Sequence, residues 1–219
     1  MIKHIFSDIG DVLMRCDGKK LCEDLAKVSS KPAEFFLERL VSNANFSLQN
    51  YPVWALKCDT GELRGECLYE EIVQKSNLKI SYSDFKKLWC SIVEPNEHGL
   101  NWLKKIQKSY TTAIVSNIGD IHWKHLYDSV PVIKNCDEYV LSYQCGFVKP
   151  KEEIFALSFD FSREFRRNCF GDLNREECLF VDDRKANCEA AQKFGFVAVE
   201  YNLHNPREFE EKVAKLGIK

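Results

Sequence analysis

Four short segments rich in β-branched and aromatic residues recur along the chain, at residues 2–6, 111–115, 177–181 and 196–200. A fifth and shorter segment of the same kind covers residues 139–142. Parallel strands that are buried on both faces have this composition, because neither face is left to solvent. The pattern predicts a sheet of four strands, extended by a short fifth one.

Amphipathic segments separate these strands in the second half of the chain. Residues 100–107 precede the second predicted strand, and residues 152–159 begin just behind Pro150. Residues 184–194 end at Gly195, and a glycine just past the last turn is an ordinary helix end. Strands that alternate with helices predict a parallel α/β sheet with right-handed crossovers.

The stretch between the first and second predicted strands has a different pattern. It contains four amphipathic segments and few strand signals, at residues 19–28, 33–41, 63–74 and 83–92, the last with Ser83 as its N-cap. A parallel crossover needs about a dozen residues, far fewer than the roughly 80 present here. We therefore predict two domains: an α/β core of residues 1–15 and 96–219, and a helical domain of residues 16–95 inserted after the first strand.

The composition is that of an ordinary globular protein. Of the 219 residues 45% are apolar and 29% charged, and 31 Lys and Arg against 33 Asp and Glu give a net charge of −2. This balance offers no charge excess that would attract nucleic acid or an anionic membrane. No apolar run approaches the roughly 20 residues of a membrane span. The strand pattern begins at Ile2, so we expect no signal peptide.

Ten cysteines are an unusual feature of this composition. No two are closer than six residues, whereas structural zinc sites place two thiolates two to four residues apart. Disulfide frameworks are typical of short secreted chains. Cys90 and Cys178 lie in apolar stretches, as small buried hydrophobic residues do. We expect reduced thiols, a cytoplasmic protein, and no part for the cysteines in its chemistry.

Polar side chains follow three of the predicted strands. Asp8 comes directly after the first strand, Ser116 and Asn117 after the second, and Asp182 and Asp183 after the third. Open parallel sheets bind their ligands beyond the carboxyl ends of the strands. We expect these side chains to share one crevice.

A lysine completes this set. Lys149 lies in the loop of residues 146–150, Gly-Phe-Val-Lys-Pro, which is able to reach the same crevice. Mg²⁺ prefers a few hard oxygen ligands alongside the phosphate of a substrate. Carboxylates together with one lysine therefore favour a Mg²⁺ ion and a phosphoryl group.

Four segments resemble the ordered motifs of the haloacid dehalogenase (HAD) superfamily: residues 8–13, 115–117, 146–150 and 180–187. Each motif is short, but the four in this order are specific, and the resemblance runs from about residue 5 to 200. The helical insertion is similar to the C1 cap of the superfamily's phosphatase branch, subfamily IA. The resemblance implies a three-layer Rossmannoid core with a parallel sheet and a helical cap.

The resemblance also implies roles in catalysis and phosphate binding. Asp8 would be the nucleophile that forms an aspartyl-phosphate, which water then hydrolyses. Lys149 would neutralise Asp8 and the phosphate. Ser116 would bind the phosphoryl oxygens through its hydroxyl, and Asn117 is the other expected phosphate-binding residue, assisted by a backbone N–H. The implied substrate is a small phosphorylated metabolite.

A Mg²⁺ site is part of the same resemblance. Its ligands would be the carboxylates of Asp8 and Asp183 and the backbone carbonyl of Gly10. Asp182 and Asn187 would orient the site. Asn187 lies four residues past Asp183, which places it one helical turn further on the same face.

The sequence departs from the phosphatase pattern at Gly10. Phosphatases of this superfamily commonly carry there a second Asp, which protonates the leaving group. Asp11 is adjacent, but we expect it to point elsewhere. Three alternatives stay open: a Mg²⁺-dependent phosphatase, a metal-independent 2-haloacid dehalogenase, and a weakly active relative that binds a phosphometabolite or a partner protein. We favour the phosphatase, since Asp8, Lys149 and Asp183 are all present.

Other polar positions are interpreted as structural. The Asp59-Thr60-Gly61 segment is interpreted as a plain loop between helices, and residues 159–174 as a long connection whose three arginines face solvent. The pair His122 and His125 has the spacing of metal ligands but no third partner, so we expect a solvated helix face. The four tryptophans are interpreted as packing residues.

Overall fold

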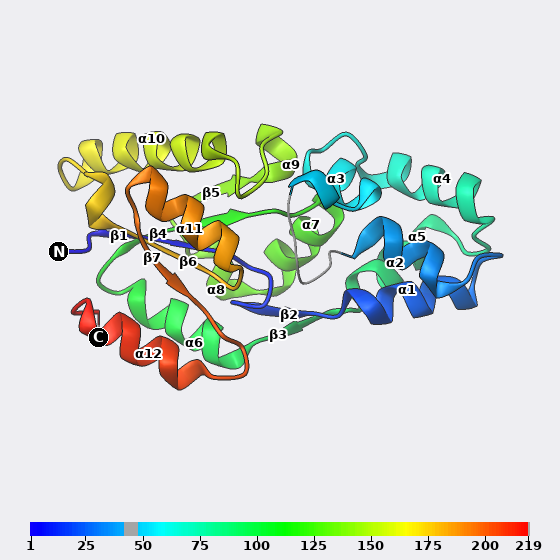
Figure 1. The fold of residues 1–219 in the computed structure, drawn as a ribbon, viewed down its shortest axis with the longest axis horizontal. Coiled ribbons are helices and arrows are strands. Elements are labelled where there is room, and N and C mark those ends of the chain that lie inside the picture. The colour runs from blue at the N-terminus through cyan, green and yellow to red at the C-terminus, as the bar shows by residue number, and fades with distance from the viewer. Residues whose placement is uncertain (42–47, 219) are drawn as a thin grey trace.

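The computed structural model describes residues 1–41 and 48–218. Its main sheet has five parallel strands in the order β5-β4-β1-β6-β7 (Figure 1). They are β1 (His4–Ser7), β4 (Thr111–Ser116), β5 (Glu138–Leu141), β6 (Cys178–Asp182) and β7 (Val197–Glu200). The five strand segments expected from the sequence are all present, and the predicted parallel α/β fold is confirmed.

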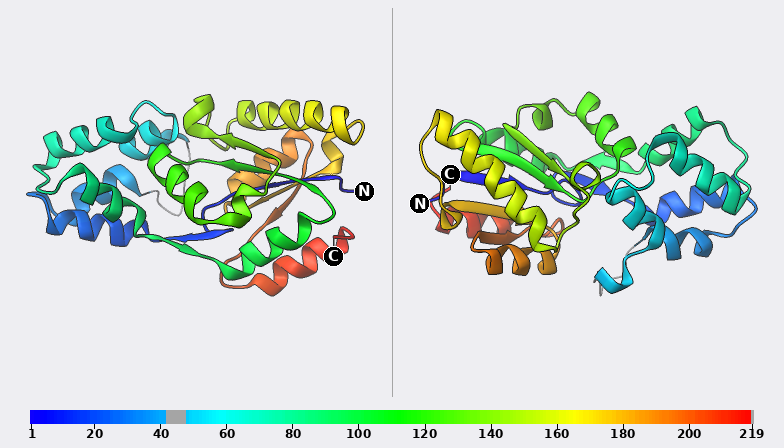
Figure 2. Two further views of the ribbon diagram at one scale, coloured as in Figure 1. Left: turned by 180° about the vertical axis from the view of Figure 1, so that it is seen from behind. Right: turned by 90° about the horizontal axis from the view of Figure 1, so that it is seen from above.

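Helices cover both faces of this sheet, and the assembly of sheet and helices is called the core below. α10 (Glu152–Cys169) and α11 (Lys185–Phe194) lie on one face, and α6 (Glu97–Ile106) and α12 (Pro206–Lys215) on the other. Figure 2 shows the three layers from two further sides. α7 (Asp120–Ser129) and the short α8 (Pro131–Lys134) join the layer of α6. The remaining short helices of the core are α9 (Ser142–Cys145) and η2 (Arg175–Glu177).

The side chains of successive strand residues pack against the helix layers on opposite faces of the sheet. Ile5 packs with the side chains of α6 and α12, whereas its neighbour Phe6 packs with those of α10 and α11. In β6 Leu179 and Phe180 divide in the same way. This alternation explains why the strand sequences are apolar on both faces.

Among the described residues, five helices between residues 17 and 92 form a separate body, called the cap below. They are α1 (Gly18–Lys27), α2 (Ala33–Leu40), α3 (Val53–Asp59), α4 (Gly65–Ser76) and α5 (Tyr82–Cys90), with the short η1 (Leu48–Asn50). Their apolar faces share a cluster that includes Phe36, Ile72 and Phe85. The cap lies beside the core in all three ribbon views, away from both chain ends.

Two short antiparallel strands join the cap to the core. β2 (Met14–Cys16) pairs with β3 (Val93–Pro95), so the chain leaves and re-enters the core side by side. This pair was not predicted from the sequence, because three residues are too few to show a period. The proposed domain boundaries at residues 16 and 95 fall on the last residues of these strands, and the division into two domains stays a prediction.

Two local expectations are wrong. α10 does not end near residue 159 but continues to Cys169, and Arg166 on it is buried rather than solvated. The Arg166 guanidinium donates hydrogen bonds to the Lys3 carbonyl and the Thr111 hydroxyl, and these acceptors compensate its burial. The N-cap of α5 is Ser81, not Ser83, because the Ser81 hydroxyl accepts from the backbone N–H of Asp84.

The ten cysteines are all described, and every one of them is free. Six are buried, among them Cys90 and Cys178, as small hydrophobic residues would be. Within the described residues, the structure contains no helix long and apolar enough to cross a membrane.

Candidate active site

The carboxyl ends of β1, β4 and β6 bring the predicted site residues to one edge of the sheet. β1 is paired with both other strands, with Ser7 opposite Ile114 and Val181, so Asp8 emerges between their ends. A pocket of about 370 Å³ opens there. It is lined by six of the predicted residues: Asp8, Gly10, Asn117, Lys149, Asp183 and Asn187. The other two, Ser116 and Asp182, are buried at the ends of β4 and β6.

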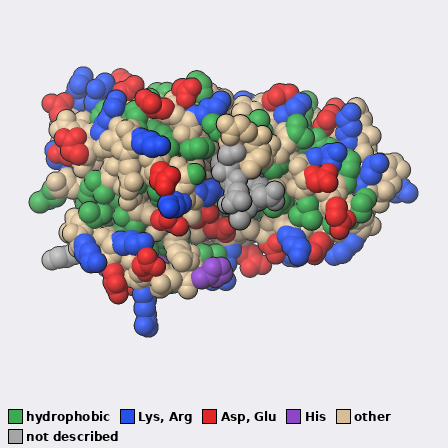
Figure 3. All heavy atoms as spheres, in the orientation of Figure 1, with side chains coloured by type: hydrophobic (Ala, Val, Ile, Leu, Met, Phe, Trp, Pro, Cys, Tyr) green, Lys and Arg blue, Asp and Glu red, His purple; other side chains and the backbone are tan. Residues whose placement is uncertain are grey.

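Residues of the cap close the opposite side of this pocket. Its lining includes Leu40, Val41, Tyr51 and Asp59 in addition to the residues of the core. On the face drawn in Figure 3, acidic and basic side chains gather next to one another where core and cap meet. The pocket therefore lies between the two bodies and is polar.

Lys149 is the centre of the site's electrostatics. Its ammonium lies 2.9 Å from Asp8 Oδ1 and 2.6 Å from Asp182 Oδ2, and donates to the Val115 carbonyl at 2.8 Å. The side chain is 1% exposed. Burial disfavours the charged form, but the two carboxylates raise the pKa of Lys149 above its usual value. The lysine is therefore a fixed cation beside Asp8.

Asp182 holds this lysine and the start of α11 together. While Oδ2 accepts from Lys149, Oδ1 accepts from the backbone N–H of Arg184 and from Asn187 Nδ2, both at 2.9 Å. Both oxygens of Asp182 are thus used within the protein. That Asp182 and Asn187 orient the site stays a prediction.

Asp8, Asp182 and Asp183 form an acidic cluster whose ligand oxygens all lie within 4.8 Å of one another. Burial, followed by the charges of Asp8 and Asp182, raises the pKa of Asp183 to about 8. A bound divalent cation would lower the pKa of this carboxyl group, because the cation stabilises the ionised carboxylates. Hard oxygen donors gathered in this way fit Mg²⁺. Since Asp182 is engaged by its neighbours, Asp8 and Asp183 are the available ligands.

Asn117 has a contact that the sequence did not reveal. Its Nδ2 donates to the Lys149 carbonyl at 3.0 Å, and the Lys149 backbone N–H donates to its Oδ1 at 2.7 Å. The amide side chain therefore anchors the lysine loop. Phosphate binding by Asn117 and by the Ser116 hydroxyl stays a prediction. Because the side-chain amide of Asn117 is engaged by its neighbours, its backbone N–H is the group that we expect to bind phosphate.

Gly10 offers no side chain to protonate a leaving group, and Asp11, which also lines the pocket, has one carboxylate oxygen engaged by the backbone. Asp11 has a left-handed backbone with φ +49°, and its Oδ1 accepts from the backbone N–H of Cys16 at 3.1 Å. A Cβ placed on Gly10 would meet only Cys16 Sγ, at 3.9 Å. The position therefore has room for a side chain that the sequence does not supply.

The cap contributes a carboxylate that sequence reasoning interpreted as part of a loop. Asp59 is the last residue of α3 and lines the pocket. The Tyr51 hydroxyl donates to Asp59 Oδ2 at 2.6 Å and accepts from Asn117 Nδ2 at 3.3 Å. Burial raises the pKa of Asp59 to about 6, although the bond from Tyr51 acts in the opposite direction. Tyr51 thus links cap and core beside the pocket.

The expectation that His122 lies on a solvated helix face is wrong. Its Nε2–H donates to the Trp89 carbonyl at 2.9 Å, and its ring stacks on that of Trp89 with centroids 5.7 Å apart. His122 is therefore a packing contact between α7 and the cap rather than part of a solvated face. Trp54, Trp89 and Trp102 are buried, which confirms their interpretation as packing residues.

Comparisons with known proteins agree with this geometry. No family model matches the chain. A curated relative, D-ribitol-5-phosphate phosphatase from Bacteroides thetaiotaomicron, is 24% identical over 203 residues, covering 90% of each chain. A HAD family enzyme from the same organism, solved with magnesium and inorganic phosphate, has 23% identity and a TM-score of 0.76, covering 93% of this chain and 96% of its own.

Two further solved structures show the same fold. A HAD-like hydrolase from Porphyromonas gingivalis has 18% identity and a TM-score of 0.76, covering 100% of this chain and 99% of its own. L-2-haloacid dehalogenase from Xanthobacter autotrophicus has 16% identity and a TM-score of 0.57, covering 92% and 78%. The fold, the four motifs at its strand ends and the curated relative agree. Over its length the chain is similar to a phosphatase and to enzymes of the haloacid dehalogenase superfamily, and it has the fold of the latter.

The similarity to these hydrolases makes the pocket between core and cap the candidate active site. The resemblance placed Asp8, Lys149 and Asp183 in one centre, and the structure brings all three into the lining of one pocket. The retained Asp183 and the curated relative favour the phosphatase branch of the superfamily over the dehalogenases.

Proposed function

We propose that the protein is a Mg²⁺-dependent phosphatase that hydrolyses a small phosphorylated metabolite through an aspartyl-phosphate on Asp8. One observation carries the proposal: a carboxylate paired with a buried ammonium shares a pocket with a second carboxylate, and both belong to one acidic cluster. An ionised Asp held beside a fixed positive charge is suited to attack a phosphoryl group.

In the first step Asp8 attacks the phosphorus of the substrate. A bond forms between a carboxylate oxygen and phosphorus, the ester P–O bond breaks, and its electron pair leaves with the alcohol oxygen. Lys149, with the Ser116 hydroxyl and backbone N–H of Asn117, stabilises the charge on the phosphoryl oxygens. In the second step the oxygen of a water bonds to the same phosphorus, the bond between phosphorus and Asp8 breaks with its electron pair returning to the carboxylate, and phosphate and a proton leave to solvent.

Asp8, Asp183 and the Gly10 carbonyl would hold Mg²⁺. When bound, the cation supplies charge neutralisation for the phosphoryl oxygens and for the two carboxylates. Asp182 takes part only through Lys149, the Arg184 backbone and Asn187, so it is a positioning residue.

The leaving alcohol receives its proton from water in this account, because position 10 lacks a carboxylate. General acid catalysis contributes roughly 10²- to 10⁴-fold. We therefore expect a preference for phosphate esters whose alcohols are good leaving groups, such as aryl, acyl or anomeric sugar phosphates.

The size of the site supports a small substrate. The pocket of about 370 Å³ lies between core and cap, so a phosphoprotein would have to displace the cap to enter. The hydrogen bond from Asn117 to the Tyr51 hydroxyl supports a cap that is held against the core at the pocket. A closed cap excludes water and selects the substrate.

A phosphate-release screen tests the proposal. Sugar phosphates, polyol phosphates, nucleotides and p-nitrophenyl phosphate are assayed with Mg²⁺ and with EDTA, for the wild type and Asp8→Asn. We expect turnover that requires both Mg²⁺ and Asp8. Halide release from 2-haloacids without metal would instead favour a dehalogenase. Binding of phosphorylated ligands without any turnover would favour a regulatory relative.

A further inference from the structure

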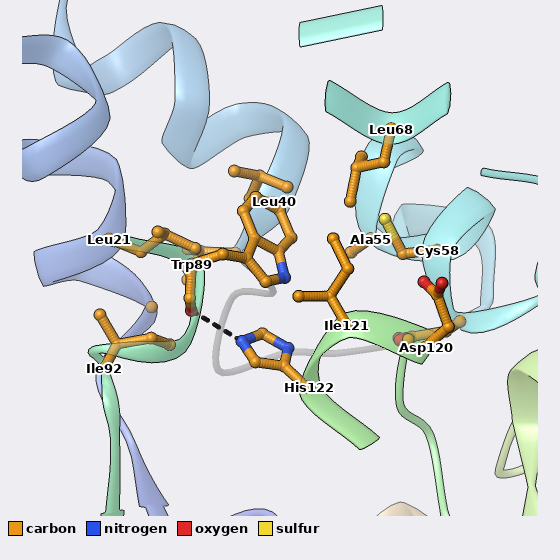
Figure 4. A pocket seen from close by; sticks show the side chains of 14 residues that line it. Leu21, Leu40, Ala55, Cys58, Leu68, Trp89, Ile92, Asp120, Ile121 and His122 are labelled. Carbon is orange, nitrogen blue, oxygen red and sulfur yellow. Dashed lines mark hydrogen bonds between the residues drawn. The ribbon is translucent and has the colours of Figure 1, made fainter. Parts of the chain in front are cut away.

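A second, apolar chamber adjoins the polar pocket between core and cap. It has a volume of about 160 Å³. Figure 4 shows side chains of the cap, including Leu21, Leu68 and Trp89, converging on it together with Ile121 of α7. The hydrogen bond from His122 to the Trp89 carbonyl fixes one wall. The site described above uses none of these side chains.

The two chambers lie next to each other. Six residues border both of them: Gly18, Leu40, Val41, Ala55, Asp59 and Ile92. A ligand whose phosphoryl group lies at Asp8 and Lys149 therefore has its other end directed past Asp59 toward the apolar chamber. The shared border makes this chamber the natural place for the alcohol portion of a phosphate ester.

The residues that line the apolar chamber determine which alcohol portion of a phosphate ester it would accept. Most side chains around the chamber are aliphatic or aromatic, and its two carboxylates, Asp59 and Asp120, have partners in Tyr51 and the Gly65 backbone N–H. A further anionic group would meet these carboxylates in a poorly solvated space, and a polyol would find few partners for its hydroxyls. An uncharged, mainly apolar group meets neither penalty.

The volume sets the size of the group. In another protein, a dry apolar cavity of about 150 Å³ binds benzene. The chamber here has nearly the same volume, so it fits one ring or a short branched chain.

We propose that the apolar chamber selects phosphate monoesters of small, uncharged, ring-sized apolar alcohols over phosphate monoesters of polyols. This inference rests on the proposed function for the placement of the phosphoryl group. It differs from the substrate that names the curated relative, a polyol phosphate. It also agrees with the absence of a side chain at Gly10, since phenol-like alcohols need less help in leaving.

A binding experiment that requires no turnover tests the inference. Calorimetry compares benzylphosphonate with methylphosphonate in the presence of Mg²⁺, two ligands that differ only by a phenyl ring in place of a hydrogen. Burial of the ring predicts an affinity for benzylphosphonate about tenfold higher or more. Equal affinities for the two ligands would overturn the inference.

Variants of Cys58 supply matched controls, because Cys58 borders the apolar chamber but not the polar pocket. Cys58→Leu reduces the space and should remove the preference for the benzyl ligand while leaving methylphosphonate binding unchanged. Cys58→Ala should keep the preference. Thermal unfolding shows whether each variant folds, and Ile121→Thr, which adds a hydroxyl to the same wall, provides a second way to weaken the preference. A preference that persists in both Cys58→Leu and Ile121→Thr would contradict the assignment.

Turnover then separates this inference from the proposed function. Benzyl phosphate and D-ribitol-5-phosphate are both esters of primary alcohols, so their leaving groups are similar. We expect kcat/KM for benzyl phosphate to be at least about tenfold higher. Faster hydrolysis of the ribitol ester would overturn the inference and support the phosphatase. No turnover of either, with the phosphonate preference intact, would support the chamber and overturn the phosphatase.

Discussion

The contacts of Lys149 link its structural role to the catalytic role that we propose for it. Its three donors contact Asp8, Asp182 and the Val115 carbonyl, so one ammonium compensates two carboxylates at the end of the sheet. The same ammonium meets the structural requirement for a buried counter-charge and, in the proposed mechanism, the requirement for a cation beside the nucleophile. Replacement of Lys149 therefore affects both stability and turnover.

Lys149→Met should remove turnover and also destabilise the fold. Removing one partner of a buried ion pair leaves uncompensated charge and costs about 3–5 kcal/mol. Urea denaturation measures the loss, with Lys151→Met as the control, because Lys151 is exposed. Equal stabilities for the two variants would show that the buried carboxylates are compensated elsewhere.

Gly10→Asp should restore a proton donor. Gly10 has no left-handed backbone, and the atom nearest to a new Cβ is 3.9 Å away, so the position accepts a side chain without strain. We expect kcat/KM to rise for esters of poorly leaving alcohols, by as much as about 10²-fold. The dependence of kcat/KM on leaving-group pKa should become flatter. Gly10→Asn is the control, and the idea fails if both variants keep the wild-type slope.

At the scale of elements, the site residues that could be predicted from the sequence are those at the ends of strands. Asp8, Ser116 and Asp182 lie at the carboxyl ends of apolar strands, and a parallel sheet brings these ends together without further information. Asp59 and Tyr51 reach the pocket only because the cap packs in one particular orientation. No local sequence pattern indicates how the cap is oriented on the core, so the pocket residues of the cap were not predicted. The pairing of Asn117 with the Lys149 backbone was missed for the same reason.

Helix α6 is held against the loop after β1 by a close approach at Gly99. A Cβ at this position would lie 1.9 Å from the Val12 carbonyl oxygen and 3.0 Å from Asn96 Nδ2. Gly99→Ala should therefore destabilise the protein by about 1–3 kcal/mol through overpacking. In an ordinary helix the same change is stabilising. A free energy of unfolding that stays the same or rises would show that α6 can shift away from the loop.

At the scale of the whole molecule, the sheet contains a buried histidine that couples stability to pH. His4 in β1 is fully buried, and its Nδ1 hydrogen-bonds with the Thr111 hydroxyl at 2.7 Å. Burial, followed by the charge of Arg166, lowers the pKa of His4 to about 3. The neutral imidazole is therefore the form that the fold accommodates.

The pH dependence follows from the sign of this shift. Because the pKa of an unfolded histidine is about 6.5, the unfolded chain binds an extra proton between the two values. The stabilisation is complete above about pH 6.5 and is lost as the pH falls toward 3, with a loss of about 2 kcal/mol between pH 7 and 5. His4→Gln should lack this part of the pH dependence in urea denaturation. Parallel curves for wild type and variant would contradict the assignment.

The central claim of the account is that Asp8 becomes phosphorylated during turnover. Rapid acid quenching during hydrolysis of a good substrate, followed by borohydride reduction and peptide mapping by mass spectrometry, detects an acyl phosphate directly. We expect the acyl phosphate on the peptide that contains Asp8, with Mg²⁺ present, and none in Asp8→Asn. Turnover without a covalent phosphate, or with the phosphate on another residue, would contradict the account.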